Sequence, residues 1–269
     1  MAATLLTIEN FASAYLETSR DIRICLPCGY SAAAECRYPV LYVHDGQNLF
    51  TDARAYSGQS WQLHRVVDEL IQAGRIDPIV LVAIDHAGPE RLAEFAHQDR
   101  YYNGHIIQAR GRDYENFIID ELKPHIDSLF HTATTAANTG LMGSSMGGLV
   151  SLNIGLRRSD IFGKVAALSP SCWWDPAALA TDLLNYRHKL SQLQLWLDIG
   201  ADEGEFGQLV PDFAAQIQRL LGNNQRRFQS YYDPRGDHSE VAWRRRVHMP
   251  LEFLFGDEKA GILPAQGRN

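Results

Sequence analysis

Short, mostly apolar runs alternate with helical patterns along most of the 269-residue chain. Six such runs lie at residues 40–45, 79–85, 139–143, 164–169, 193–199 and 226–233. Short runs of this kind are typical of strands that are buried on both faces, as in a parallel sheet. Between them, the segments 61–71, 114–130 and 212–221 repeat their apolar residues at helical spacing. Strands that alternate with helices predict right-handed βαβ units.

The predicted fold is α/β, with a doubly wound and mostly parallel sheet. At the N-terminus, residues 12–18 and 20–26 partly alternate polar and apolar side chains, so we expect an antiparallel pair at this edge. Pro124 should kink or divide the helix over 114–130. A chain of this length can bury one large core, and we therefore expect a single domain over residues 1–269.

The composition and the charge of the chain argue against some classes of function. The formal net charge of −7 argues against a general nucleic-acid binder, and Arg244-Arg245-Arg246 is the only basic cluster. In a predicted helix these arginines indicate a solvated or salt-bridged face. No apolar run approaches the roughly 20 residues that span a bilayer. No signal peptide is visible, and the four cysteines show no zinc-finger spacing, so we expect a cytoplasmic location. The oligomeric state stays open.

The stretch LMGSSMGGLV contains the pattern Gly143-x-Ser145-x-Gly147. A chain with this many glycines and serines would match it by chance about one time in ten, and a glycine-rich turn is the alternative. However, a predicted strand ends just before Ser145 and a helical pattern follows it. This strand–turn–helix setting is the one in which a nucleophile elbow occurs, so Ser145 is the candidate nucleophile.

A serine hydroxyl needs a base, and the base needs an orienting carboxylate. In this kind of fold the chain order is serine, acid, histidine. His238 follows the last predicted strand and is the candidate base, whereas His248 lies inside a helical pattern. The acid should follow the strand over 193–199. Four carboxylates lie there, and spacing alone does not separate Asp202 from Glu203; the four are Asp198, Asp202, Glu203 and Glu205.

Two backbone N–H groups are expected to form an oxyanion hole. The first belongs to Met146, directly after the candidate nucleophile. The second belongs to Gln47, just beyond the strand over 40–45, although an ordinary turn is the alternative here. Trp173 and Trp174 follow another strand end and are candidate substrate-binding residues; aromatic residues at such positions are also ordinary core.

The chain resembles the putative-esterase family of α/β hydrolases, which includes esterase D, feruloyl esterases, enterochelin-type esterases and mycolyltransferases. The resemblance covers about residues 12–255 and rests on seven blocks: YVHDGQNLF, IDHAGPERLAEF, YENFIIDELKPHID, MGSSMGGLVSL, FGKVAALSPSCWW, DIGADEG and HSEVAWRRR. It implies the α/β-hydrolase fold and a Ser-His-acid triad with no metal or organic cofactor. It also implies a G-x-x-[DE] pattern for the acid, which puts Glu203 in that role and leaves Asp202 as the alternative.

The residues and the resemblance together predict a serine esterase. It would cleave a small-molecule carboxylic ester through an acyl-enzyme, with a triad of Ser145, His238 and Glu203. Two alternatives stay open: an acyltransferase that uses the same triad, and a non-catalytic binding module of hydrolase fold. The sequence does not predict the natural ester.

Overall fold

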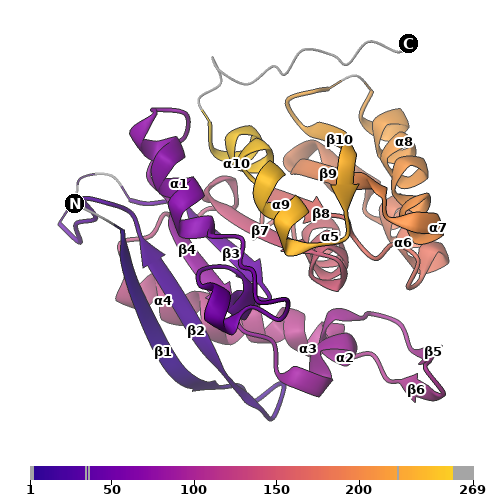
Figure 1. Cartoon of the computed structure of the whole chain (residues 1–269), viewed down its shortest axis with the longest axis horizontal. Helices are drawn as coiled ribbons and strands as arrows, with labels where there is room; N and C mark the ends of the chain where they lie inside the picture. The colour runs from indigo at the N-terminus through magenta and orange to yellow at the C-terminus, as the bar shows by residue number, and fades with distance from the viewer. Residues whose placement is uncertain (1–2, 34, 36, 223, 257–269) are drawn as a thin grey trace.

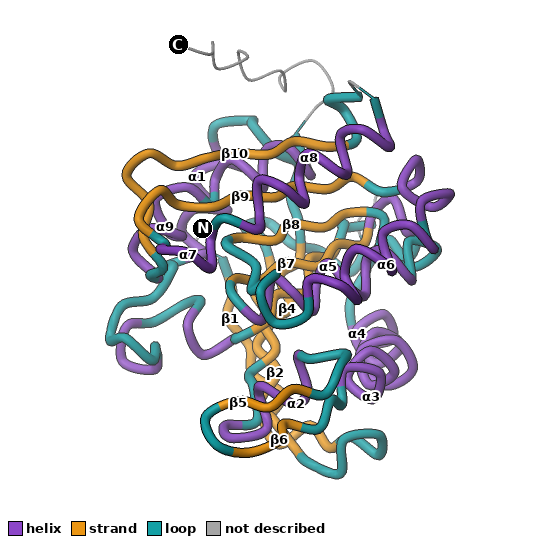
Figure 2. The backbone as a smooth tube through the Cα atoms, turned by 90° about the vertical axis from the view of Figure 1, so that its right-hand side faces the viewer, coloured by secondary structure: helices purple, strands orange, loops and turns teal. Residues whose placement is uncertain are grey.

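The computed structural model describes residues 3–33, 35, 37–222 and 224–256, with the backbone alone at Glu205 and Phe206. Its main element is an eight-stranded sheet in the order β1-β2-β4-β3-β7-β8-β9-β10. Figure 2 shows the part from β7 to β10 side by side. The strands are β1 Thr4–Ala12, β2 Ser19–Leu26, β3 Val40–His44, β4 Val80–Ile84, β7 Thr139–Ser144, β8 Lys164–Leu168, β9 Gln194–Asp202 and β10 Phe228–Asp237. The six strands from β4 to β10 are parallel, whereas β1 and β2 add an antiparallel edge. The predicted fold class is confirmed.

Helices cover both faces of this sheet (Figure 1). They are α1 Leu63–Gln72, α2 Arg91–Phe95, α3 Gly111–Asn116, α4 Lys123–Leu129, α5 Met146–Arg157, α6 Pro176–Asn185, α7 Gly204–Gly207, α8 Leu209–Leu221, α9 Glu240–Arg246 and α10 His248–Phe255. Helices α1, α9 and α10 pack on one face, and α2–α6 with α8 pack on the other. Consecutive residues of β3 alternate between the two cores, because Tyr42 joins one and Leu41 and Val43 join the other.

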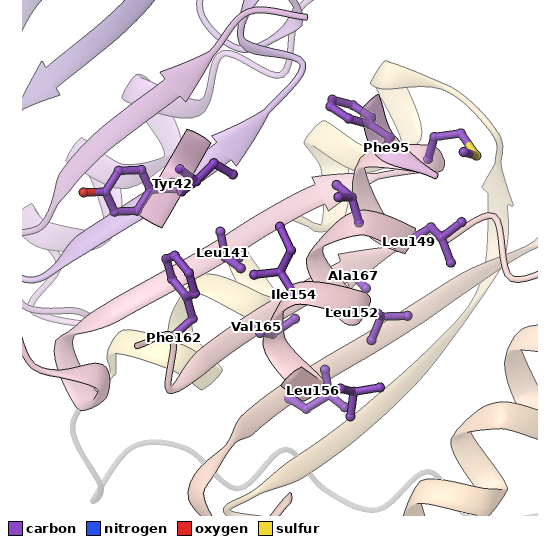
Figure 3. Packing of buried hydrophobic residues seen from close by; sticks show 14 of the residues in the cluster. Tyr42, Phe95, Leu141, Leu149, Leu152, Ile154, Leu156, Phe162, Val165 and Ala167 are labelled. Carbon is purple, nitrogen blue, oxygen red and sulfur yellow. The ribbon is translucent and has the colours of Figure 1, made fainter. Parts of the chain in front are cut away.

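Helix α5 is the central helix of the second face. All of its residues are buried, as expected for a helix that is apolar on most sides. Figure 3 shows Ile154 beside Leu141 of β7 and Val165 of β8. Gly155 packs against the same strand, since a Cβ there would lie 2.4 Å from a methyl group of Val165. This close packing fixes the start of α5 relative to the ends of the strands.

The N-terminal edge differs from the expectation. Residues 12–18 do not form the first strand; β1 lies upstream, at Thr4–Ala12, and pairs with β2. The segment 13–18 is instead the turn, closed by a hydrogen bond from the Ser13 N–H to the Thr18 carbonyl and by a positive φ of 55° at Glu17. The misplacement has a physical cause: β1 is an edge strand with mostly exposed side chains, so it lacks a clear buried face.

The helix predicted over 114–130 is divided, as expected. A π-helical turn, Phe117–Leu122, separates α3 from α4, and Pro124 lies in the first turn of α4. The unpredicted elements include a hairpin of two short strands, β5 Arg100–Tyr102 and β6 His105–Ile107, that extends away from the main sheet (Figure 1). The single-domain prediction stays untested, and its residues 257–269 lie outside the described part.

Candidate active site

Ser145 connects the end of β7 to the start of α5. Its backbone has φ 57° and ψ −125°, an unfavourable conformation for a residue with a side chain. The close packing of this turn depends on glycine. A Cβ on Gly143 would lie 2.6 Å from the backbone of Gly147, and one on Gly147 would lie 3.1 Å from the Asp45 carboxylate. The first glycine of the G-x-S-x-G pattern is therefore a steric requirement of this turn, and the second packs tightly against Asp45.

His238 follows β10 directly, and its side chain reaches Ser145 although β8 and β9 lie between β10 and β7 in the sheet. Its Nε2 lies 3.0 Å from Ser145 Oγ. The next residue, Ser239, caps α9 by accepting the N–H of Ala242. The ring of Trp243, in the same helix, meets the imidazole edge to face at 4.9 Å between centroids. The start of α9 thus orients the histidine. His248, the weaker candidate, is the first residue of α10.

The carboxylate beside His238 belongs to Glu203. Its Oε2 lies 2.8 Å from His238 Nδ1. Asp202 is still in β9, paired with Asp237, and is exposed. Asp198 lies deeper in the strand, where its carboxylate accepts hydrogen bonds from Arg246 and Trp196. The side chain of Glu205 lies outside the described part of the chain.

Glu203 is held as an ionised acceptor. Burial would raise the pKa of this carboxyl, but hydrogen bonds from His238, the Ser169 hydroxyl and the Gly200 N–H outweigh it, so the pKa is lowered. The Glu203 side chain is 3% exposed, whereas His238 is 45% exposed. The carboxylate is thus enclosed, while the imidazole borders solvent.

The loop after β3 lies beside the start of α5. Asp45 adopts a left-handed conformation, and Arg91 binds its carboxylate through two hydrogen bonds of 2.6 and 2.8 Å. The next residue must be glycine, because a Cβ on Gly46 would lie 2.6–2.9 Å from Asp85 and Ala83.

Gln47 follows in the short 3₁₀ turn Gly46–Asn48, and Met146 is the first residue of α5. Neither backbone N–H has an acceptor within its own helix, as is usual for a helix start. Asp45 contacts the Gly147 position, so the two helix starts lie side by side.

The two tryptophans have different environments. Trp174 is 1% exposed, and its indole N–H donates to the Gln98 carbonyl. Trp173 is partly exposed and stacks near Tyr102 of β5, with ring centroids 5.8 Å apart. The Arg100 guanidinium lies 5.3 Å from the Trp173 ring centre. Of the pair, Trp173 is therefore the one with surface to offer a substrate.

Three further residues near Ser145, His238 and Glu203 were not predicted from the sequence. Ser171 Oγ lies 3.3 Å from Ser145 Oγ. Ser169 and Arg246 lie behind Glu203, where Arg246 is 2% exposed. The expected solvated or salt-bridged face of 244–246 is salt-bridged at two of its arginines: Arg245 pairs with Asp233, and Arg246 pairs with Asp198 and is buried rather than at the surface. The position of Ser169 and Ser171 could have indicated their place near the site. Both follow the strand that ends at Leu168, and ligands bind beyond the carboxyl ends of the strands in such sheets.

No cluster of three or more histidine, cysteine, aspartate or glutamate side chains has the geometry to hold a metal ion in the described part of the chain. Among the helices within 3–33, 35, 37–222 and 224–256, none is long and apolar enough to cross a bilayer.

This chain is similar to known proteins in sequence and in fold. A relative in Bacillus subtilis, the uncharacterized protein YbbA, is 26% identical over 199 residues, which cover 71% of this chain and 72% of YbbA. A solved ferulic acid esterase superposes with a TM-score of 0.73 at 20% identity, covering 94% of this chain and 98% of its own. An IroE-like serine hydrolase from Shewanella oneidensis superposes with a TM-score of 0.75 at 22% identity, covering 94% of this chain and 80% of its own.

A sequence model of the family described as "Putative esterase" matches residues 13–252. This range includes every strand from β2 to β10 and every residue of the candidate site. The chain belongs to the putative esterase family and is a carboxylic ester hydrolase.

Proposed function

We propose that the protein hydrolyses a small-molecule carboxylic ester through an acyl-enzyme on Ser145. The observation that carries the proposal is the unbroken chain of contacts from Ser145 Oγ through His238 to Glu203, with distances of 3.0 and 2.8 Å. These distances suit the proton transfers that a serine nucleophile requires.

The direction of each hydrogen bond follows from the charges. Ionised Glu203 has no proton to give, so His238 Nδ1 donates to it and Nε2 is left as an acceptor. The Ser145 hydroxyl then donates to Nε2, and its oxygen can accept a hydrogen bond from Ser171. In the reaction, Nε2 takes the serine proton as Ser145 Oγ attacks the ester carbonyl, and the imidazolium gives that proton to the departing alcohol.

The negative charge on the carbonyl oxygen needs donors that are fixed before the reaction. The N–H groups of Met146 and Gln47 suit this role, because the helix starts that hold them lie side by side. The bidentate pair between Arg91 and Asp45 and the requirement for glycine at Gly46 make the second donor rigid. A water molecule would then attack the acyl-enzyme, with His238 acting as base again.

The partly exposed ring of Trp173 is the proposed substrate-binding surface. Its contacts with Tyr102 and Arg100 give this surface an aromatic and a cationic component. The triad acid is Glu203 in this proposal, and Asp202 has no part in it. The cytoplasmic location stays a prediction of the sequence.

Kinetics on p-nitrophenyl esters test the proposal. Ser145→Ala should lower turnover by about 10⁴-fold or more with the fold retained. Ser144→Ala is the matched control, since Ser144 is buried and belongs to β7. Activity that survives Ser145→Ala but is lost in Ser144→Ala would overturn the assignment. Product analysis with alcohol and thiol acceptors separates hydrolysis from acyl transfer.

A further inference from the structure

The triad acid is connected to a buried arginine through a single hydroxyl group. Ser169 follows β8 and is 1% exposed. Its Oγ lies 2.6 Å from Glu203 Oε1, 2.9 Å from Trp243 Nε1 and 2.6 Å from an Arg246 guanidinium nitrogen. All three partners are within hydrogen-bond distance. Trp243 and Arg246 belong to α9, and Glu203 lies between β9 and α7.

The chemistry of these partners fixes the direction of every bond. The indole N–H and the guanidinium are donors only, so they occupy the two lone pairs of the Ser169 oxygen. The single hydroxyl proton must then go to Glu203 Oε1. The Gly200 N–H donates to the same oxygen at 2.7 Å. Oε1 therefore accepts two hydrogen bonds and has no room for a proton of its own.

Arg246 supplies the charge behind this arrangement. Its guanidinium lies 2.9 Å from Asp198 and 3.7 Å from each of Glu203 and Asp233. One buried cation thus faces three carboxylates. A cationic donor polarises the O–H bond of a serine more strongly than a neutral donor does. The hydrogen bond from Arg246 to the Ser169 oxygen therefore strengthens the hydrogen bond that Ser169 donates to Glu203.

The backbone of Ser169 also indicates a special position. Its φ is +43°, in the left-handed region that favours glycine. Its N–H donates to both the carbonyl and the carboxylate of Asp198. A non-glycine residue keeps this conformation only where the surrounding structure determines it, and here the hydroxyl makes three contacts that glycine could not make.

We propose that Ser169 is a positioning residue for the triad acid. It links Arg246 to Glu203, keeps the carboxylate ionised and turns Oε2 toward His238. This inference rests on the proposed function, because it acts only through the role of Glu203 in the triad. Nothing in it requires Ser169 to touch the substrate.

The test is the pH profile of kcat/KM on p-nitrophenyl acetate for Ser169→Ala. Loss of a hydrogen bond to the ionised form makes a carboxylate more basic. The acid limb of the profile should therefore move to higher pH by about one unit, and kcat should fall by roughly 10- to 100-fold. The shift belongs to the coupled histidine–carboxylate pair and does not depend on which member takes the proton.

Two further variants keep the test decisive. Ser169→Gly removes the same hydroxyl and suits the positive φ, so it replaces Ser169→Ala if that variant fails to fold. Thr132→Val is the matched control: Thr132 is buried and donates to the Asp127 carboxylate at 2.7 Å, in a segment that precedes β7. This control should leave the profile unchanged. An unmoved acid limb in a folded Ser169 variant would overturn the proposal.

A double variant separates this inference from the proposed function. If Ser169 acts through Glu203, then adding Ser169→Ala to Glu203→Gln should cost little beyond the single Glu203→Gln change. If the double variant instead loses activity by the product of the two single losses, Ser169 does not act through Glu203. This result would reject the role of Ser169 but not the role of Glu203 in the triad. Full activity in Glu203→Gln alone would instead reject Glu203 as the triad acid.

Discussion

At the scale of single residues, the site depends on which of two adjacent carboxylates faces His238. Glu203 and Asp202 differ by one position in the chain and by one methylene in the side chain. The strand β9 continues through Asp202, whose side chain is exposed at the carboxyl end of the strand. The chain turns at Glu203, whose longer side chain reaches back over Gly200 to the histidine. A shift of one residue therefore decides the role.

Glu203→Gln should retain the fold and lose about 10²- to 10⁴-fold in kcat, because an amide cannot hold the tautomer of His238 or stabilise the imidazolium. Asp202→Asn is the control and should lose less than about twofold, since Asp202 is exposed. Steady-state kinetics on one ester substrate compare the two. The reverse ranking would show that the triad acid is Asp202.

At the scale of elements, the candidate site is formed by residues that follow the ends of five strands. The strands β3, β7, β8, β9 and β10 are parallel, so their carboxyl ends lie on one edge of the sheet. The residues just beyond them include Gln47, Ser145, Ser169, Glu203 and His238. Positions up to 191 residues apart in the chain, from Gln47 to His238, thus meet without any long connecting loop across the site.

Gly143→Ala tests the steric argument for the turn at Ser145. The added Cβ would lie 2.6 Å from the Gly147 backbone, so we expect a loss of about 2 kcal/mol or more in the free energy of unfolding. Gly58→Ala is the comparison: Gly58 has φ +73° but open space around it, and roughly 1 kcal/mol is expected from the backbone alone. Urea denaturation measures both. Equal stability of the two variants would contradict the close packing of the turn.

The sequence predicted the elements that are buried on both sides. Strands such as β3 and β4 read as continuous apolar runs, because neither face meets water. The edge strand β1 and the three-residue strands β5 and β6 give no such signal, and they were misplaced or missed. The hydrophobic pattern in the sequence is thus clearest for strands that are buried on both faces.

The sequence could predict members of the candidate site only where they follow strands in a fixed chain order. That rule proposed Ser145 and His238 from residue type and position. The network behind Glu203 follows no such rule: Ser169 and Arg246 are 77 residues apart and meet only through the packing of α9 on the sheet. An arginine in a basic triplet gives no sign in the sequence that it is the buried one.

At the scale of the whole molecule, buried titratable groups link stability to pH, and His44, His97 and Asp85 are prominent among them. Burial lowers the pKa of His44 and of His97 to about 4 in each case. Between pH 6.5 and 4, the unfolded chain binds a proton at each histidine that the folded chain does not, so stability falls as pH falls. Burial also raises the pKa of Asp85 to about 6. This carboxyl acts in the opposite direction, because its folded form binds the proton more readily.

Two histidines outweigh one carboxyl, so the free energy of unfolding should be about 2 kcal/mol lower at pH 5 than at pH 7. Urea denaturation at the two pH values measures the difference. In His97→Gln, which cannot titrate, the difference should shrink by more than half. A wild-type protein that is equally stable at both values would contradict the neutral state of the buried imidazoles.

The most direct test of the central claim is the mass of the protein during ester turnover. A reaction with a p-nitrophenyl ester is quenched in acid within the first turnovers, and the intact mass and the proteolytic peptides are measured. We expect a gain in mass equal to one acyl group, located on Ser145. The gain should be absent from Ser145→Ala and should be lost again as the free acid forms. Steady hydrolysis with no acylated protein, or an acyl group on Ser144 or Ser171 in place of Ser145, would contradict the central claim.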